Sequence, residues 1–403
     1  MNISESKAVD ISQLPDVDLS EAALLNAARA NTGLDDFGDN ADWREGFSLL
    51  VGCLRDEARL HKVGRLIAFS DVVRNLENRL RVTDDVKRHP EILEQRIVKP
   101  LFVVGLPRTG STILHDIMSK DPANRVPMTW ECHNMSPPPE RATFDTDPRI
   151  AVCDENLNKT AFTFMPQFRA IHEMGALLAQ ECVILNCFDF KSISFAHMFR
   201  IPTYERWVES TDLTSLYRTH KRQLQYMQWR NPRERWVLKS VGHLWGLDAI
   251  YDVYPDAQVV MTHRDPVKLV ASHCSLVSTA LGMSSSIVDK KEVGACWSAS
   301  WEDAMRRGVA FRKSGRQEAV TVFDMHFSEL VADHLGVVQR IYNHFGLELT
   351  DVAKERMRDF IASNPKDRHG THRYTIQEFG LDALRERERY RFYKDYFQVS
   401  EEH

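Results

Sequence analysis

Short runs of apolar residues, separated by stretches with helical periodicity, constrain the fold of this chain most strongly. The first run covers residues 101–104, and the segments 236–238, 258–261 and 320–323 repeat its pattern. A continuous apolar run of this length is typical of a strand buried on both faces, as in a parallel sheet. Strands that alternate with helices predict an α/β fold of three layers around a central parallel sheet.

The helical stretches complete the expected organisation. A helical N-terminal region should cover residues 1–97, and the α/β domain should cover 98–403 with a helical, aromatic-rich insertion at about 150–230. Apolar residues recur with a period near 3.6 in several segments, as they do in amphipathic helices. We expect such helices at about 20–33, 42–61, 64–80, 110–119, 244–252, 266–281, 295–313 and 326–345.

Composition narrows the class of protein. The 403 residues are 43% hydrophobic and 27% charged with a net charge of −5, which is ordinary for a globular protein and argues against nucleic acid as a partner. The seven cysteines include no CxxC pair, and the polar, acidic start of the chain does not resemble a secretory signal. Because no apolar run approaches the length of a membrane span, we expect a cytoplasmic protein with no membrane span.

The segment 105–112 joins the first strand directly to a helix through a glycine-bounded loop. Such a loop leaves backbone N–H groups unpaired near the positive end of the helix dipole, which predicts an anion site. Gly105 and Gly110 have the spacing of the Walker A loop, but Ser111 stands where its lysine should be. The cation lies inside the loop instead, as Arg108. This favours a phosphate site that differs from that of ATP and GTP hydrolases.

A second candidate phosphate site follows the strand at 258–261. Arg264 comes at the end of this strand, and Ser272 lies two helical turns further along. A guanidinium offers two parallel donors to a phosphate, and a hydroxyl can complete the shell. The tripeptide His263-Arg-Asp265 also suggests a protein kinase, but Val270 occupies the required asparagine position and no GxGxxG occurs.

These two segments resemble the nucleotide-binding elements of sulfotransferases that use 3′-phosphoadenosine 5′-phosphosulfate (PAPS). The resemblance extends over about 99–380, and the arginine form of the loop is similar to that of tyrosylprotein and many bacterial sulfotransferases. It implies a P-loop-like fold and a loop that holds the 5′-phosphosulfate, while Arg264 and Ser272 hold the 3′-phosphate. The loop residues implied are Pro107, Arg108, Thr109, Gly110, Ser111 and Thr112.

The resemblance also implies catalytic residues. Lys239, at the end of the strand at 236–238, would stabilise the leaving oxygen together with Arg108. Glu131 is the first candidate for the base that accepts the proton of the acceptor, and His243 is the second. Arg373, in a C-terminal loop similar to one that closes over the nucleotide in bacterial members, is a further candidate for the 3′-phosphate.

The implied reaction is transfer of a sulfuryl group from PAPS to a hydroxyl of a small-molecule or lipid acceptor, with adenosine 3′,5′-bisphosphate as product and no metal required. The alternatives are a small-molecule kinase of the P-loop type and a catalytically inactive nucleotide-binding protein. Aromatic residues between 188 and 207 either line an apolar acceptor pocket or pack as ordinary core.

Overall fold

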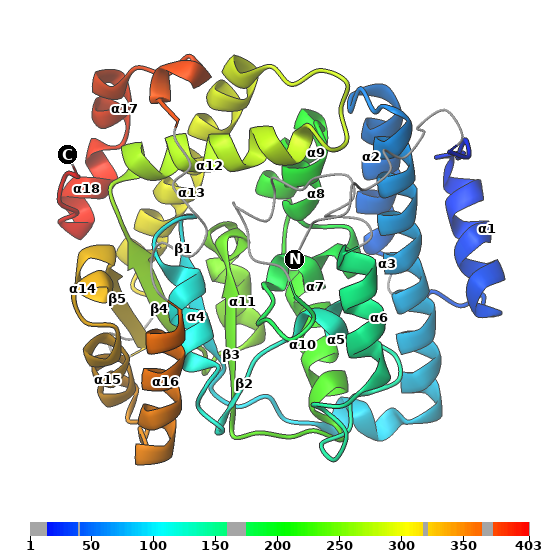
Figure 1. The fold of residues 1–403 in the computed structure, drawn as a ribbon, viewed down its shortest axis with the longest axis horizontal. Coiled ribbons are helices and arrows are strands. Elements are labelled where there is room, and N and C mark those ends of the chain that lie inside the picture. Colours follow the sequence, from blue (N-terminus) through cyan, green and yellow to red (C-terminus); the bar gives the residue numbers. More distant parts are fainter. Residues whose placement is uncertain (1–13, 39–40, 159–174, 317–320, 365–373, 403) are drawn as a thin grey trace, which may run out of the picture.

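A parallel sheet forms the centre of the structure. The computed structural model describes residues 14–38, 41–158, 175–316, 321–364 and 374–402. Within these residues the sheet has five strands in the order β2-β3-β1-β4-β5, and every neighbouring pair is parallel (Figure 1). The strands are β1 (Leu101–Gly105), β2 (Asn124–Arg125), β3 (Arg235–Ser240), β4 (Gln258–His263) and β5 (Val322–His326). The parallel α/β sheet predicted from the sequence is therefore confirmed.

Strand β1 lies in the middle of the sheet and is buried on both faces. Successive side chains of a strand point to opposite faces. Leu101 and Val103 accordingly join one apolar cluster, while Phe102 and Val104 join another. All four side chains are fully buried, so helices cover both faces of the sheet and three layers result.

The first face is covered by helices near both ends of the α/β segment. Leu114 and Ile117 of α4 pack with Val337 and Ile341 of α15 in the apolar cluster of this face. These helices are α4 (Ser111–Met118), α14 (Phe327–Ala332), α15 (His334–Phe345) and α16 (Asp351–Ser363). A single helix was expected at 326–345, but the chain forms α14 and α15 because Asp333 caps a new helix by accepting a hydrogen bond from Gly336 N at 2.8 Å.

The second face carries the larger apolar cluster, which also includes residues of the N-terminal helices. The helices on this side and at the C-terminal end of the chain are α10 (Thr214–Gln228), α11 (Leu247–Val253), α12 (Pro266–Leu281), α13 (Lys290–Ser314), α17 (Ala383–Arg389) and α18 (Arg391–Phe397). The short 3-10 helices are η2 (Pro90–Glu94), η5 (Cys187–Asp189), η6 (Val241–Trp245) and η8 (Ile376–Phe379).

Three helices precede the sheet and lie at one side of the molecule (blue in Figure 1). They are α1 (Glu21–Thr32), α2 (Trp43–Asp56) and α3 (Lys62–Arg88). Helix α3 continues past the predicted end near residue 80, because Val82 and Asp85 are buried and fix the extra turns. Asp85 accepts hydrogen bonds from Tyr226 and Ser136, which ties α3 to α10.

Shorter helices occupy the segment between α4 and α10. They are α5 (Thr129–His133), α6 (Pro148–Leu157), α7 (Cys182–Asn186), α8 (Ser194–Met198) and α9 (Pro202–Ser210). The aromatic residues between 188 and 204 pack as core: Phe190 contacts the rings of Trp43 and Phe47, and Phe195 contacts Tyr204. Among the described helices, none has both the length and the apolar character that crossing a membrane requires.

Two acidic side chains of α9, the buried Glu205 and the half-buried Glu209, contact α13. Burial, and then the charge of Glu209, raises the pKa of Glu205 to about 8. Cys296 Sγ donates to this carboxyl group at 3.3 Å. An unfolded glutamate titrates near pH 4.5. Between these values the folded protein retains a proton that the unfolded chain releases, so the free energy of unfolding should fall as the pH rises through this window.

Replacing Glu205 should therefore change the pH dependence of stability. We expect Glu205→Gln to melt at a higher temperature than the parent at pH 8, because glutamine mimics the protonated acid, and the difference should shrink toward pH 5. Thermal unfolding followed by circular dichroism at several pH values measures this. Glu348→Gln, at an exposed position, is the control. A difference that stays constant with pH would contradict the assignment.

Candidate active site

The loop after β1 is held tightly against β4. An added Cβ at Gly105 would lie 2.0 Å from Thr262 Oγ1, so only glycine allows the two strands to approach this closely. Thr109 Oγ1 donates to Leu106 O at 2.8 Å and shares a hydrogen bond with Thr262 Oγ1 at 2.6 Å. The Thr109 side chain is fully buried and fixes the shape of the loop. Because this side chain is occupied in the interior, the group of Thr109 that can contact a ligand is its backbone N–H.

The loop adopts a backbone conformation that few residues tolerate. Arg108 has a φ of 63° and Gly110 a φ of 82°, both in the left-handed region. A left-handed arginine costs of order 1–3 kcal/mol and persists where the surroundings impose it, commonly at a functional site. Gly110 precedes α4 without a capping side chain, so the first N–H groups of this helix stay available beside the exposed Arg108. Helix N–H groups beside an exposed guanidinium are the arrangement that the sequence predicted for the anion site.

Lys239 approaches the same helix from β3. It lies opposite Val103 of β1 in the sheet, and its Nζ donates to Thr112 Oγ1 at 3.1 Å. The Lys239 side chain is 3% exposed and also forms an ion pair with Glu181, which directly precedes α7. The predicted catalytic lysine and the predicted loop residue Thr112 are therefore in contact.

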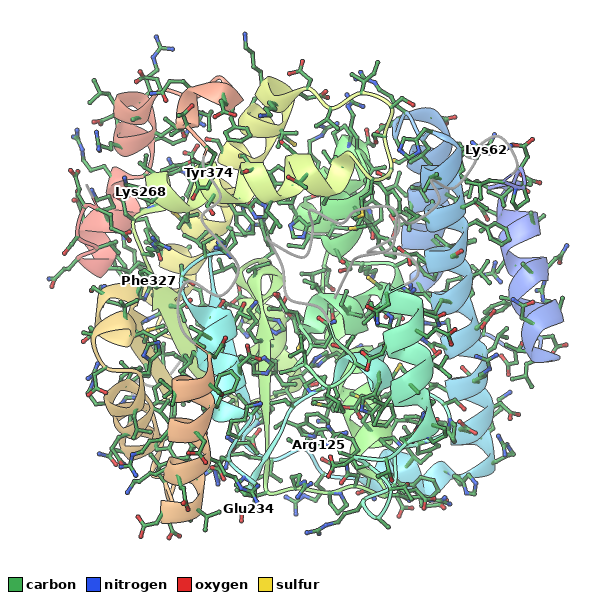
Figure 2. All side chains as sticks on the ribbon, in the orientation of Figure 1. Lys62, Arg125, Glu234, Lys268, Phe327 and Tyr374 are labelled. Carbon is green, nitrogen blue, oxygen red and sulfur yellow. The ribbon has the colours of Figure 1, made fainter. Side chains whose placement is uncertain are left out.

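Arg264 joins the two predicted phosphate sites. It follows β4, and its Nη1 donates to the backbone oxygen of Arg108 at 2.8 Å. Its Nε and Nη2 donate to the two carboxylate oxygens of Glu402 at 2.7 and 2.8 Å. The guanidinium lies 4.0 Å from the ring centroid of Phe327, which Figure 2 labels beside α14. Two parallel N–H donors of Arg264 therefore bind one carboxylate, and the same arrangement of donors binds a phosphate.

The helix after Arg264 explains the kinase-like tripeptide. Asp265 caps α12 by accepting a hydrogen bond from Val267 N at 3.1 Å. His263 is buried, with Nδ1 bonded to Tyr393 Oη at 2.7 Å and Nε2 to Asp324 Oδ1 at 2.9 Å. Both residues have structural roles here. Ser272 lies on α12 and is half-buried.

Glu131 is completely buried within an ion pair. Its Oε1 accepts hydrogen bonds from Arg125 Nη1 at 2.8 Å and from Met128 N at 2.6 Å, and its Oε2 also contacts Arg125. Arg125 lies opposite Trp236 at the start of β3, whereas Lys239 lies near the end of that strand. At about 3.3 Å per residue, this separates Trp236 from Lys239 by about 10 Å. Figure 2 shows Arg125 toward the opposite end of the sheet from Phe327.

His243 lies in the core beside β1. Its Nδ1 is hydrogen-bonded to Tyr217 Oη at 2.7 Å, and its ring packs edge-on against Phe102. Burial, reinforced by nearby His220 and Lys239, holds the pKa of His243 well below its usual range. The assignment of the base to Glu131 or His243 stays a prediction. Both oxygens of the Glu131 carboxylate are hydrogen-bonded inside the protein, whereas His243 has one bonded nitrogen, and its Nε2 is buried without a hydrogen-bond partner among the described residues.

The remaining predicted residues divide into two groups. Pro107 and Ser111 are buried in the loop, while Arg373 lies outside the described residues. Two carboxylates that contact the predicted cations, Glu181 and Glu402, were missed because neither belongs to a recognisable local pattern. Within the described part of the chain, no group of three or more histidine, cysteine or acidic side chains has a geometry that could hold a metal ion.

The shape of the loop leads to a stability prediction. An added Cβ at Gly110 would lie 2.7 Å from Leu330 Cδ2, whereas one at Gly315, which has a similar φ of 68°, would meet no atom within 4 Å. Both alanine variants carry the left-handed penalty of about 1–2 kcal/mol. Gly110→Ala should therefore lower the melting temperature more than Gly315→Ala does. Equal losses would show that α14 does not confine the loop.

Known sulfotransferases resemble this chain in sequence and in fold. Residues 100–351 match the profile of the sulfotransferase family. The crystal structure of sulfotransferase STF1 from Mycobacterium tuberculosis H37Rv is 32% identical, with a TM-score of 0.82 over 92% of this chain and 98% of that one. Sulfotransferase STF9 from Mycobacterium avium is 28% identical, with a TM-score of 0.87 over 96% of this chain and 99% of that one.

A more distant relative has a more specific name. The omega-hydroxy-beta-dihydromenaquinone-9 sulfotransferase Stf3 of Mycobacterium bovis (strain ATCC BAA-935 / AF2122/97) is 22% identical over 296 residues, which are 69% of this chain and 71% of that protein. The P-loop-like fold and the sulfotransferase activity predicted from the sequence are confirmed by these similarities. The chain belongs to the sulfotransferase family.

Proposed function

We propose that this sulfotransferase takes its sulfuryl group from PAPS and transfers it to a hydroxyl of an apolar, lipid-like acceptor. The observation that carries the proposal is the 2.8 Å hydrogen bond from Arg264 Nη1 to Arg108 O, which couples two cationic sites at the ends of adjacent strands. Two coupled sites suit a nucleotide with phosphates at both its 3′ and 5′ positions. The membership of the sulfotransferase family supports the same donor.

Each site has a distinct role in this proposal. Arg108 and the backbone N–H groups from Thr109 to Thr112 bind the 5′-phosphosulfate at the start of α4. Arg264, Ser272 and Arg373 bind the 3′-phosphate. Arg264 then exchanges the carboxylate of Glu402 for a phosphate, which is a comparable bidentate partner.

Lys239 supports the transfer step. As the acceptor oxygen bonds to sulfur and the bond from sulfur to the bridging oxygen breaks, negative charge builds on that bridging oxygen. The Lys239 ammonium neutralises this charge from its position beside Thr112. The side chain is nearly excluded from water, which strengthens its electrostatic effect.

The acceptor class is supported by the relative Stf3, whose name specifies a hydroxylated menaquinone derivative. A kinase is less consistent with the loop, since Ser111 replaces the lysine that a P-loop kinase uses on the transferred phosphate. A catalytically inactive nucleotide-binding protein is distinguished by assaying sulfuryl transfer directly.

Nucleotide titration tests the two coupled sites. We expect adenosine 3′,5′-bisphosphate to bind more tightly than AMP or ATP, because only this nucleotide can occupy both sites. Arg264→Ala should weaken its binding by about 10- to 100-fold, since charge-assisted contacts are each worth roughly 1.5–3 kcal/mol. Isothermal titration calorimetry measures both effects.

The control for this titration is Arg316→Ala, which removes an arginine that pairs with Asp248 and Asp252 on the surface. Its affinity for adenosine 3′,5′-bisphosphate should match that of the parent. Tighter binding of ATP, or equal affinity for AMP and the bisphosphate, would contradict the proposed donor.

The ion pair with Glu402 gives an independent prediction. Because this carboxylate occupies the donors of Arg264, Glu402→Gln should increase the affinity for adenosine 3′,5′-bisphosphate several-fold while leaving that for AMP almost unchanged. The same calorimetric titration compares the two ligands. A parallel change for both nucleotides would indicate that Glu402 does not compete with the 3′-phosphate.

A further inference from the structure

Glu181 occupies an unusual position for an acidic residue at a helix start. It precedes α7 in extended conformation, where acidic residues commonly cap the helix, but its carboxylate makes no capping hydrogen bond. The carboxylate instead contacts Lys239 Nζ, which also holds Thr112 Oγ1 at 3.1 Å. One ammonium group therefore separates Glu181 from the first turn of α4, where the 5′-phosphosulfate is proposed to bind.

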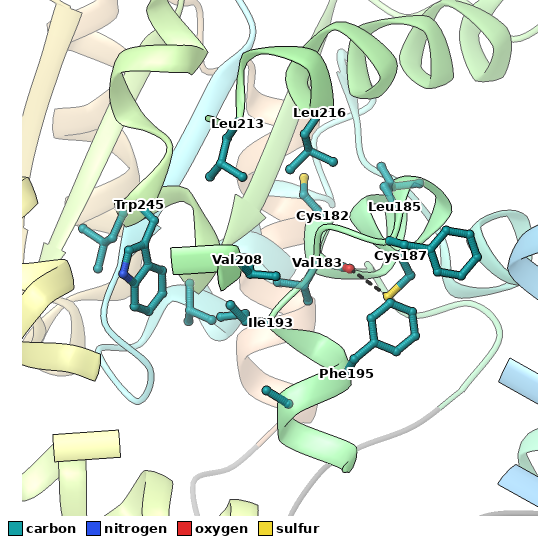
Figure 3. Close-up of a cluster of buried hydrophobic side chains, with 14 of the residues drawn as sticks. Cys182, Val183, Leu185, Cys187, Ile193, Phe195, Val208, Leu213, Leu216 and Trp245 are labelled. Carbon is teal, nitrogen blue, oxygen red and sulfur yellow. Dashed lines mark hydrogen bonds between the residues drawn. The ribbon is translucent and has the colours of Figure 1, made fainter. Parts of the chain in front are cut away.

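The backbone around Glu181 is fixed from both sides. Gln180 N donates to Pro127 O at 2.7 Å, and the Gln180 side chain accepts the N–H of Glu181 at 2.8 Å. On the other side, Cys182, Val183 and Leu185 of α7 enter a cluster of buried apolar side chains (Figure 3). A group anchored in this way keeps its orientation, as a catalytic group must.

Exposure distinguishes Glu181 from the two bases predicted from the sequence. Its side chain is 23% exposed, while that of Glu131 is 0% exposed and lies inside the pair with Arg125. His243 is likewise fully buried. A base must come within hydrogen-bond distance of the hydroxyl that it deprotonates. Among these three side chains, Glu181 alone combines contact with Lys239 and access to solvent.

We infer that Glu181 is the general base of the sulfuryl transfer, an inference that rests on the proposed function. Its carboxylate accepts the proton of the acceptor hydroxyl as the oxygen bonds to sulfur. The bond between sulfur and the bridging oxygen breaks, and its electron pair remains on the 5′-phosphate of adenosine 3′,5′-bisphosphate. The products are the sulfate ester, the bisphosphate and a proton, which Glu181 then releases to water.

Lys239 links the two ends of this reaction. An ammonium group has three donors, so it can hold Thr112 and Glu181 and still donate to the bridging oxygen. Before the reaction it neutralises Glu181, which limits repulsion between this carboxylate and the anionic donor. The lysine thus acts at the leaving oxygen and positions the base on the opposite side of the transferred group.

The test compares Glu181→Gln with the parent, using PAPS and dodecanol in detergent micelles as the apolar hydroxyl probe. We expect kcat to fall by about 10²–10⁴-fold, the usual contribution of a general base. The affinity for adenosine 3′,5′-bisphosphate should be retained or increase, because a negative charge beside the anion site is removed. Glu181→Asp keeps a carboxylate and should recover part of the lost kcat.

Matched variants keep the result interpretable. Glu140→Gln, which breaks an exposed pair with Arg230, should leave kcat unchanged. Thermal unfolding of each variant establishes that it is folded. Near-parental kcat in Glu181→Gln, or loss of kcat that Glu181→Asp does not relieve, would overturn the inference. If Glu181→Gln keeps its kcat while Glu131→Gln or His243→Asn loses most of its kcat, the base is Glu131 or His243 instead.

The proposed function fails in a different way. If the parent binds adenosine 3′,5′-bisphosphate but does not transfer a sulfuryl group to dodecanol, the proposed acceptor class is wrong. The inference about Glu181, which depends on it, is then withdrawn. If the parent does not bind the bisphosphate, the proposed donor is wrong.

Discussion

The close approach of β1 and β4 at Gly105 is the constraint on which the site depends. Contact between the glycine backbone and Thr262 brings the ends of both strands together, and the hydrogen bond between Thr109 and Thr262 fixes the loop that follows. Arg108 and Arg264 then lie close enough for one to donate to the backbone of the other. A larger residue at position 105 would separate the strands and with them the two proposed phosphate sites.

Two carboxylates balance the cations that this geometry gathers. Glu181 pairs with Lys239 and Glu402 pairs with Arg264, so the nearly buried lysine and the arginine are both neutralised. Burying an unpaired charge is expensive, and a partner lowers that cost. The two partners differ in their proposed roles: Glu402 yields its place to a phosphate, while Glu181 stays beside Lys239 and takes part in the reaction.

Four of the five strands, the loop and the sulfotransferase activity were predictable because each has a local signal, whereas the short strand β2 (Asn124–Arg125) has none. Continuous apolar runs mark buried strands, and the glycines at 105 and 110 mark the loop between strand and helix. The pairs at the site lack such a signal, since Glu181 is 58 residues from Lys239 and Glu402 is 138 residues from Arg264. The extended α3 and the division between α14 and α15 also depend on side chains that contact distant elements or cap a helix end. Tertiary packing decides the pairs at the site and the length of α3, whereas a local cap at Asp333 divides α14 from α15, and apolar periodicity records none of these features.

A crystal structure of the protein with adenosine 3′,5′-bisphosphate tests the central claim most directly, that two coupled sites at the ends of β1 and β4 bind the two phosphates. The account predicts the 5′-phosphate on the backbone N–H groups at the start of α4 and the 3′-phosphate on Arg264, released from Glu402. A 3′-phosphate held elsewhere, with the pair between Arg264 and Glu402 intact, would contradict it.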